Sequence, residues 1–250
     1  MSKILTGFHA ITSRLRQAPE SVSEIYIDTE RNDARAKDLR KLAERLNVRM
    51  IPVDSKRLDG MAAGVRHQGV VAQAGVLEMP KFIEDVLESI EEPPLFLILD
   101  GVQDPHNLGA CLRVADGAGA HAVIAPKDRS VGLTTAAIKV ASGAAESVPY
   151  IVVTNLARTM RELKDKGVWL VGADDSAPQS IYAAKLDGAM GLVLGAEGEG
   201  LRRLTKDSCD LLVSIPMMGS VSSLNVSVAS GVCLYEARRR RLDSTGRKPR

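Results

Sequence analysis

The chain has 250 residues, of which 45% are hydrophobic, and its formal net charge is +2. This length allows one large or two modest domains with a substantial core, whereas the small net charge argues against binding nucleic acid through overall charge. The sequence contains no run of about 18 apolar residues and no secretory apolar segment at its start, so we expect a cytoplasmic protein without a membrane span.

The first 75 residues alternate between helical and extended patterns, which predicts a small α/β domain. A stretch over 76–94 with several prolines and acidic residues then suits a linker between domains, although it contains a short amphipathic pattern. The elements that we predict before this linker are helices over 10–17 and 34–46 and strands over 25–28, 49–53 and 69–74.

A different pattern begins at residue 95, where short apolar runs alternate with helical segments. Such alternation predicts a mostly parallel sheet covered by helices on both faces. We expect this second domain to span 95–242 and to be followed by a disordered basic tail over 243–250. The predicted strands are 95–99, 122–125, 151–153, 168–172, 192–194 and 211–215.

Three of these strands lead through polar or glycine-rich turns into helices. Ligands of open α/β sheets bind at the carboxyl ends of the strands, so these turns are candidate ligand loops. We expect the helix after the first turn to begin at Asn107, a good N-cap residue. The glycines of the second turn, Gly195, Gly198 and Gly200, do not have the spacing of a dinucleotide-binding fingerprint, and the chain has no phosphate-binding loop of the NTPase kind.

Cysteine and arginine usage adds two expectations. The three cysteines, at 111, 209 and 233, are too few and too dispersed for a zinc knuckle or a disulfide framework, so we expect buried or partly buried thiols and no metal site. Basic residues crowd 31–49 and 238–241, but acidic residues interleave the first cluster. A solvated helix face and an RNA contact therefore both remain open for that cluster.

The three turns together resemble the motifs of the SpoU (TrmH) family of RNA ribose 2′-O-methyltransferases. The first motif is Asn107-x-Gly109-x-x-x-Arg113, and the second is Gly195-x-Glu197-x-x-Gly200. The third extends from Ile215 to Ser227. Further segments, at 7–10, 67–70, 126–130 and 144–149, are similar to the members that methylate a guanosine ribose in the peptidyl-transferase region of bacterial large-subunit ribosomal RNA.

The resemblance implies a C-terminal α/β domain with a deep trefoil knot, preceded by a small ribosomal-protein-like α/β domain that binds the RNA. It also implies a homodimer formed through the C-terminal domain. The implied methyl donor is S-adenosylmethionine, and the implied cofactor-binding residues are Gly195, Gly198, Gly200, Ile215, Met217 and Leu224. In such a family we expect the basic segment to contact RNA through Arg35, Arg40 and Arg45.

The resemblance further implies a catalytic group of Asn107, Arg113, Glu197, Ser223 and Asn225. The family assigns the general base to the arginine of the first motif, here Arg113. A guanidinium normally stays protonated, so Arg113 could instead hold the target phosphate and stabilise the developing alkoxide. Two alternatives remain open for the whole chain: a methyltransferase for another RNA such as tRNA, and an RNA-binding knot protein without turnover.

Overall fold

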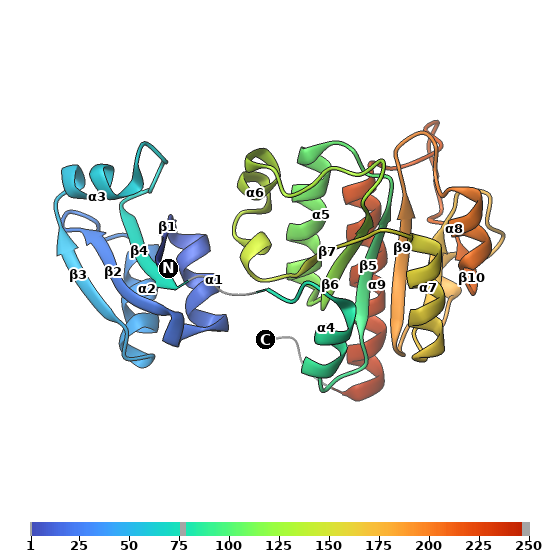
Figure 1. Cartoon of the computed structure of the whole chain (residues 1–250), viewed down its shortest axis with the longest axis horizontal. Helices are drawn as coiled ribbons and strands as arrows, with labels where there is room; N and C mark the ends of the chain where they lie inside the picture. The colour runs from blue at the N-terminus through green and yellow to red at the C-terminus, as the bar shows by residue number, and fades with distance from the viewer. Residues whose placement is uncertain (1, 76–78, 247–250) are drawn as a thin grey trace. The chain divides into compact units, whose positions relative to one another are not determined.

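The computed structural model describes residues 2–75 and 79–246, and the chain divides into two compact units (Figure 1). The first unit comprises Met1–Met79 and Ser142–Ser147, and the second comprises Pro80–Ala141 and Val148–Arg250. Among the described residues, no helix combines the length and the apolar character that crossing a membrane requires.

The first unit is a four-stranded sheet in the order β1-β4-β2-β3, in which only β2 and β3 run parallel. On one face, Ile11 of α1 and Leu39 of α2 pack with alternate strand residues such as Ile25. On the other face, Leu58 of α3 packs with Tyr26. The elements are β1 (Ser2–Thr6), α1 (Phe8–Gln17), β2 (Val22–Asp28), α2 (Ala34–Arg45), β3 (Arg49–Val53), α3 (Ser55–Ala62) and β4 (Val70–Gly75), with a short 3-10 helix at Pro19–Ser21.

The second unit is a six-stranded parallel sheet in the order β10-β8-β9-β5-β6-β7. Its strands are β5 (Leu95–Asp100), β6 (Ala122–Pro126), β7 (Tyr150–Val153), β8 (Trp169–Ala173), β9 (Met190–Gly195) and β10 (Leu211–Val213). Its helices are α4 (Ile83–Ser89), α5 (Pro105–Ala118), α6 (Thr135–Ala141), α7 (Leu156–Asp165), α8 (Arg203–Ser208) and α9 (Val226–Thr245). Two 3-10 helices lie at Ala144–Glu146, in the first unit, and at Ile181–Ala183.

Helices cover both faces of this parallel sheet (Figure 1). Apolar residues of α4 and α7, such as Val86 and Met160, pack with Phe96 and Ile98 of β5 in one core cluster. Helix α5 packs with α6 and α9 in a second layer. The predicted fold class is thereby confirmed, whereas the trefoil knot stays a prediction.

The predicted start of the helix after β5 was wrong. Asp104 is the N-cap residue of α5, and its carboxylate accepts a hydrogen bond from the His106 N–H at 2.6 Å. Pro105 occupies the first helical position, where its missing N–H costs nothing. Asn107 is therefore the third residue of the helix, within its first turn, and its side chain is not needed as a cap.

The arginine run near the C-terminus is bound within the second unit. The guanidinium of Arg238 donates to the Ala118 carbonyl at 2.7 Å, and that of Arg241 donates to the Pro93 carbonyl at 2.7 Å. Arg239 and Arg240 share the carboxylate of Glu236. Arg238 and Arg241 thus join α9 to the end of α5 and to the segment before β5. Of the predicted basic tail, residues 247–250 lie outside the described part of the chain.

Candidate active site

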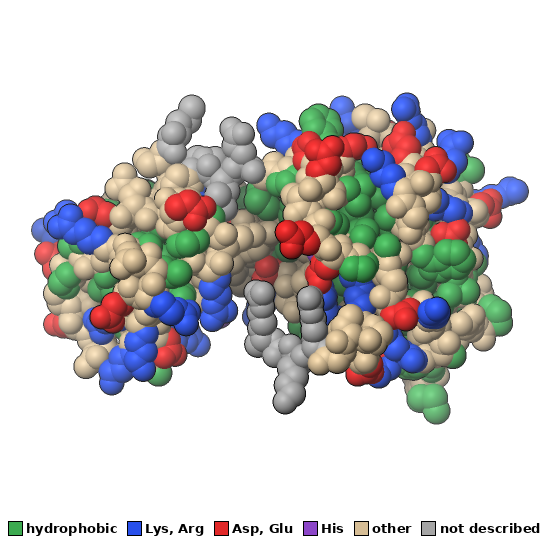
Figure 2. Space-filling model, turned by 90° about the horizontal axis from the view of Figure 1, so that it is seen from below, with side chains coloured by type: hydrophobic (Ala, Val, Ile, Leu, Met, Phe, Trp, Pro, Cys, Tyr) green, Lys and Arg blue, Asp and Glu red, His purple; other side chains and the backbone are tan. Residues whose placement is uncertain are grey.

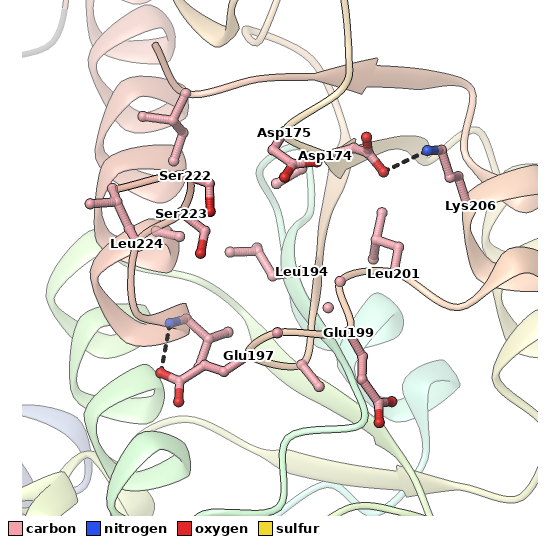
Figure 3. A pocket seen from close by; sticks show the side chains of 18 of the residues that line it. Asp174, Asp175, Leu194, Glu197, Glu199, Leu201, Lys206, Ser222, Ser223 and Leu224 are labelled. Carbon is pink, nitrogen blue, oxygen red and sulfur yellow. Dashed lines mark hydrogen bonds and ion pairs between the residues drawn. The ribbon is translucent and has the colours of Figure 1, made fainter. Parts of the chain in front are cut away.

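A pocket of about 460 Å³ lies at the carboxyl edge of the parallel sheet (Figure 3). Its walls come from the loops after β8, β9 and β10 and from the start of α9. These strands are parallel, so their following loops meet at one edge, which is the usual ligand site of such sheets. Glu197 and Ser223 of the predicted catalytic group line this pocket. All six residues predicted to bind a cofactor line it too: Gly195, Gly198, Gly200, Ile215, Met217 and Leu224.

Each glycine of the second motif is required at its position for a steric reason, and the reasons differ. A Cβ atom at Gly195 would lie 2.0 Å from the carbonyl carbon of Gly200, because the loop folds back over the end of β9. The Gly200 N–H closes this turn on the Ala196 carbonyl at 3.0 Å. Gly198 and Gly200 have φ values of +78° and +67°, which glycine adopts without strain. Gly219 of the third motif, by contrast, has open space around it and does not line the pocket.

The lining combines apolar side chains with an excess of negative charge. Leu194, Leu201 and Leu224 present aliphatic surface, while carboxylates come from both the β8 and the β9 loops (Figure 3). Lys206 supplies an ammonium group. The full set of acidic lining residues is Asp174, Asp175, Glu197 and Glu199. Four carboxylates against one lysine favour a ligand that carries positive charge.

Asp174 is held in its ionised form. Burial opposes ionisation, but hydrogen bonds from Lys206 and Ser176 outweigh it and lower the pKa of this carboxyl group below its ordinary value. The Lys206 ammonium lies 2.7 Å from Asp174 Oδ2, and the Ser176 N–H donates to Oδ1 at 3.0 Å (Figure 3). The same ion pair fixes the position of Lys206 at the pocket wall.

Asn225 connects the three sequence motifs. Its Nδ2 amide donates to Asn107 Oδ1 at 2.9 Å and also to Glu197 Oε1. Its Oδ1 accepts from the Ser227 N–H at 2.9 Å, which caps α9. The Glu197 carboxylate also accepts from the Val226 N–H at 3.4 Å. The structure thus brings together three of the five predicted catalytic residues, with Ser223 two positions before Asn225 on the same loop.

Arg113 lies apart from this group. It is on the exposed side of α5, and no residue in the described part of the chain forms a hydrogen bond or ion pair with its side chain. Six positions of an α-helix correspond to about 9 Å along the axis and about 120° around it. Since Asn107 faces Asn225, Arg113 starts from a different side of the helix, and its guanidinium, held by no described residue, is free to meet a ligand.

Sequence reasoning missed the three charged pocket residues that lie outside the three motifs, Asp174, Asp175 and Lys206. The first two directly follow β8, which the sheet order places between β9 and β10. The predicted strand over 168–172 is followed after one alanine by two aspartates, and this was the available signal. The turn after this strand is not glycine-rich, and nothing in the chain order shows that β8 lies between β9 and β10.

The residues predicted to bind RNA divide between two roles. Arg35 and Arg45 line a groove between α1 and α2 of the first unit, a unit on which Figure 2 shows many Lys and Arg side chains. Arg40 is half-buried and donates from its guanidinium to the Arg31 carbonyl at 2.9 Å. Its charge therefore helps to hold the segment that precedes α2.

The chain belongs to the SpoU rRNA methylase family, whose model matches residues 94–235. A second model, described as RNA 2′-O ribose methyltransferase substrate binding, matches residues 4–80. The family predicted from the three motifs is thereby confirmed.

Among its relatives is the 23S rRNA (guanosine-2′-O-)-methyltransferase RlmB of Ralstonia nicotianae, which is 63% identical over 240 residues that cover 96% of each chain. The Escherichia coli protein of the same name is 51% identical over 243 residues, covering 96% of this chain and all of the relative.

Solved structures agree with this fold. A crystal structure of an RNA 2′-O ribose methyltransferase is 26% identical with a TM-score of 0.70, covering 96% of this chain and 89% of that one. The SpoU methyltransferase AviRb from Streptomyces viridochromogenes, solved with its cofactor AdoMet, is 24% identical with a TM-score of 0.68 over 97% and 91% of the two chains. At that identity AviRb supports the fold alone.

Proposed function

We propose that this protein transfers a methyl group from S-adenosylmethionine to the ribose 2′-OH of a guanosine in 23S rRNA. The observation that carries this proposal is the Asn225 cluster, which joins all three family motifs at the wall of one pocket. Relatives that share 51% to 63% identity over nearly the whole chain bear the name of this activity. We place the target in the peptidyl-transferase region on the resemblance of the motifs, and the enzyme in the cytoplasm, where bacterial rRNA is found.

The pocket residues fit the cofactor in size and charge. A volume of about 460 Å³ falls within the range of roughly 300 to 1,000 Å³ typical of small-molecule sites. Aliphatic side chains such as Leu194 and Ile215 suit an adenosine, and main-chain groups of the 195–200 loop are available for its polar edge. The acidic lining suits a sulfonium, which supplies an activated methyl group when bound.

The chain's own residues then have to position a ribose and manage one proton. With the cofactor bound, the new C–O bond would form as the C–S bond breaks, the demethylated cofactor would leave, and the proton of the ribose 2′-OH would pass to solvent water. We assign the positioning to Ser223 and to Asn225, whose amide Asn107 and Glu197 orient. We assign to Arg113 the neighbouring RNA phosphate and the negative charge that develops on the ribose oxygen, because a guanidinium is suited to anions rather than to proton abstraction.

We also propose a homodimer formed through the second unit. Helix α9 exposes 52% of Val228 and 54% of Tyr235, and these residues are seven positions apart. Seven positions correspond to two helical turns, so both side chains lie on one face of the helix. An exposed apolar stripe on a helix favours contact with a second copy. Sedimentation of Tyr235→Glu should show loss of the dimer, and a wild-type protein that sediments as a monomer would contradict the proposal.

The activity is tested by mapping ribose methylation in the RNA of a deletion strain. We expect one 23S rRNA guanosine to lose its methyl group and to regain it when the wild-type chain is supplied. Loss of a tRNA methyl group instead would favour the tRNA alternative, and no loss in any RNA would favour a binding protein without turnover.

Arg113 is tested with the purified protein. Arg113→Ala should lower methyl transfer by about a hundredfold or more and leave cofactor binding in calorimetry unchanged. Arg113→Lys should restore activity only in part, because an ammonium lacks the planar fork. Arg158→Ala, which removes an exposed arginine of α7, is the matched control. Full turnover by both Arg113 variants would remove this residue from the mechanism.

A further inference from the structure

A second concavity, within the first unit, surrounds the loop between α3 and β4. Its volume is about 670 Å³. Its charged lining consists of three arginines and two carboxylates, Arg31, Arg35, Arg66, Asp28 and Asp59. The other lining residues are Ser55, Gly64, Val65, His67, Gln68 and Gly69. No sequence motif of the methyltransferase reaction includes the arginine at 66.

The three arginines differ in how they are held. The guanidinium of Arg31 lies 5.4 Å from the ring centroid of Phe8 and forms an ion pair with Asp33 at 2.5 Å. Its stem packs on Gly69, where a Cβ atom would lie 3.2 Å from Arg31 Cδ. Arg35 and Arg66 are exposed, and their side chains form no hydrogen bond or ion pair with any residue that the structure describes. One cation is thus fixed in place beside two that are available to a ligand.

The loop itself has a defined shape. Ala63 and Gln68 have φ values of +47° and +54°, a left-handed conformation that costs a non-glycine residue on the order of 1 kcal/mol. Side-chain contacts maintain this shape. His67 Nδ1 accepts from the Gly69 N–H at 3.1 Å, and His67 Nε2 lies 3.0 Å from Asp59 Oδ1. The concavity is therefore formed before any ligand arrives, at the cost of local strain.

The mixture of charges selects the kind of ligand. Guanidinium groups bind phosphate, and their planes also stack on unpaired bases. Carboxylates would repel a bare phosphate but accept hydrogen bonds from base N–H groups. Asp28 and Asp59 each use only Oδ1 in hydrogen bonds with described residues, so their Oδ2 atoms remain acceptors. A ligand with both an anionic part and N–H donors satisfies this lining, and a nucleotide has both.

We propose that this concavity binds an unpaired nucleotide of the RNA substrate, with its phosphate on Arg35 and Arg66 and its base edge toward Asp28 or Asp59. This nucleotide site rests on the proposed function, because the nucleotide would belong to the RNA that the protein methylates. A base-paired duplex presents phosphates but keeps its Watson–Crick edges occupied, so the carboxylates favour RNA with unpaired bases. The predicted RNA contact at Arg35 extends here from the groove between α1 and α2, since Arg35 lines both concavities.

The experiment measures binding of the full-length protein to two RNAs by fluorescence anisotropy over a range of salt concentrations. One RNA is a hairpin with an unpaired loop, and the other is a blunt duplex of equal length. We expect Arg66→Ala to lower the salt slope for the hairpin by about 0.7 to 0.9, which corresponds to about five- to eightfold weaker binding near 0.1 M salt. Binding to the duplex should not change.

The matched control is Arg49→Ala, which removes another exposed arginine of the first unit. Arg49 pairs with Glu24 at 3.2 Å and lines neither concavity. It should leave binding to both RNAs unchanged. If Arg66→Ala weakens both RNAs equally, the concavity is a general phosphate surface and the proposal is wrong. If it weakens neither, the site does not bind RNA. Wild-type methylation of 23S rRNA, measured alongside, shows whether the proposed function itself has failed.

Discussion

Asp100 and Arg202 connect the end of β5 to the start of α8 and thereby hold the far end of the loop that lines the pocket. The side chain of Asp100 is fully buried, whereas 35% of the Arg202 side chain is exposed. Asp100 Oδ1 accepts from Arg202 Nε at 2.6 Å, and Oδ2 accepts from the Arg202 backbone N–H at 3.0 Å. The loop over 195–202 is thus anchored at Gly195 by β9 and at Arg202 by this carboxylate.

The substitution Asp100→Asn keeps the volume of the side chain but turns an amide N–H₂ toward one of these donors. A hydrogen bond to a charged group contributes about 1.5 to 3 kcal/mol, and breaking a buried ion pair costs about 3 to 5 kcal/mol. Water can solvate the guanidinium that is released, so we take the lower end, about 3 kcal/mol. For a chain of this size, about 2 to 4 °C in Tm per kcal/mol gives a decrease of about 6 to 12 °C.

Thermal and urea unfolding, followed by circular dichroism, measure this loss, and calorimetry with S-adenosylmethionine measures the effect on the pocket. We expect cofactor affinity to fall together with stability. Arg202→Ala and the double variant complete a cycle, for which we expect a coupling energy on the order of 2 kcal/mol. Arg203→Ala, which removes an exposed neighbour, is the control and should change stability by less than about 0.5 kcal/mol. Stability and cofactor affinity of Asp100→Asn equal to wild type would refute the anchoring argument.

Two further substitutions test packing and pH dependence. Gly109→Ala would place a Cβ atom 2.5 Å from the Ala137 carbonyl oxygen, so urea unfolding should show the free energy of unfolding reduced by about 1 to 3 kcal/mol. The control is Gly60→Ala, at a helical position with open space around it, which should be neutral or stabilising. Burial, assisted by nearby arginines, lowers the pKa of His121, whose Nδ1 accepts from the Leu95 N–H at 2.9 Å. The unfolded chain therefore binds the extra proton first, and stability should be fully present above about pH 6.5 and decrease as the pH falls below it. His121→Gln should flatten that decrease, and an unchanged pH profile would show that another group causes it.

The sequence allowed most of the fold to be predicted, because the alternation of apolar runs and helical patterns was strong. Two elements, β1 (Ser2–Thr6) and α3 (Ser55–Ala62), were not predicted. The edge strand β1 buries only Leu5, and the eight residues of α3 bury only Leu58 and Ala62. Periodicity needs several core positions to be recognised, and these elements offer one or two.

The predicted pocket residues come together because each lies at the end of a strand or on the loop that follows one, and parallel strands bring these loops to one edge. Strand order does not follow from chain order, however. The sheet inserts β8 between β9 and β10, and only this placement adds Asp174 and Asp175 to the lining. Glu197 and Glu199 lie in the glycine-rich turn itself, but the further negative charge of Asp174 and Asp175, which bears on the charge of the ligand, was not predictable from that turn.

At Asn107, the prediction of an N-cap concealed a second role for the side chain, the hydrogen bond to Asn225. As an N-cap, its side chain would be explained by the needs of the helix alone. The structure gives that role to Asp104, whose carboxylate accepts from the His106 N–H, while Pro105 has no N–H to satisfy. A helix needs one N-cap, so α5 does not need the Asn107 side chain for this purpose. That side chain accepts a hydrogen bond from Asn225 instead. The positioning role of Asn107 thus depends on Asp104, three positions earlier, because the Asp104 carboxylate caps the helix and leaves the Asn107 amide available.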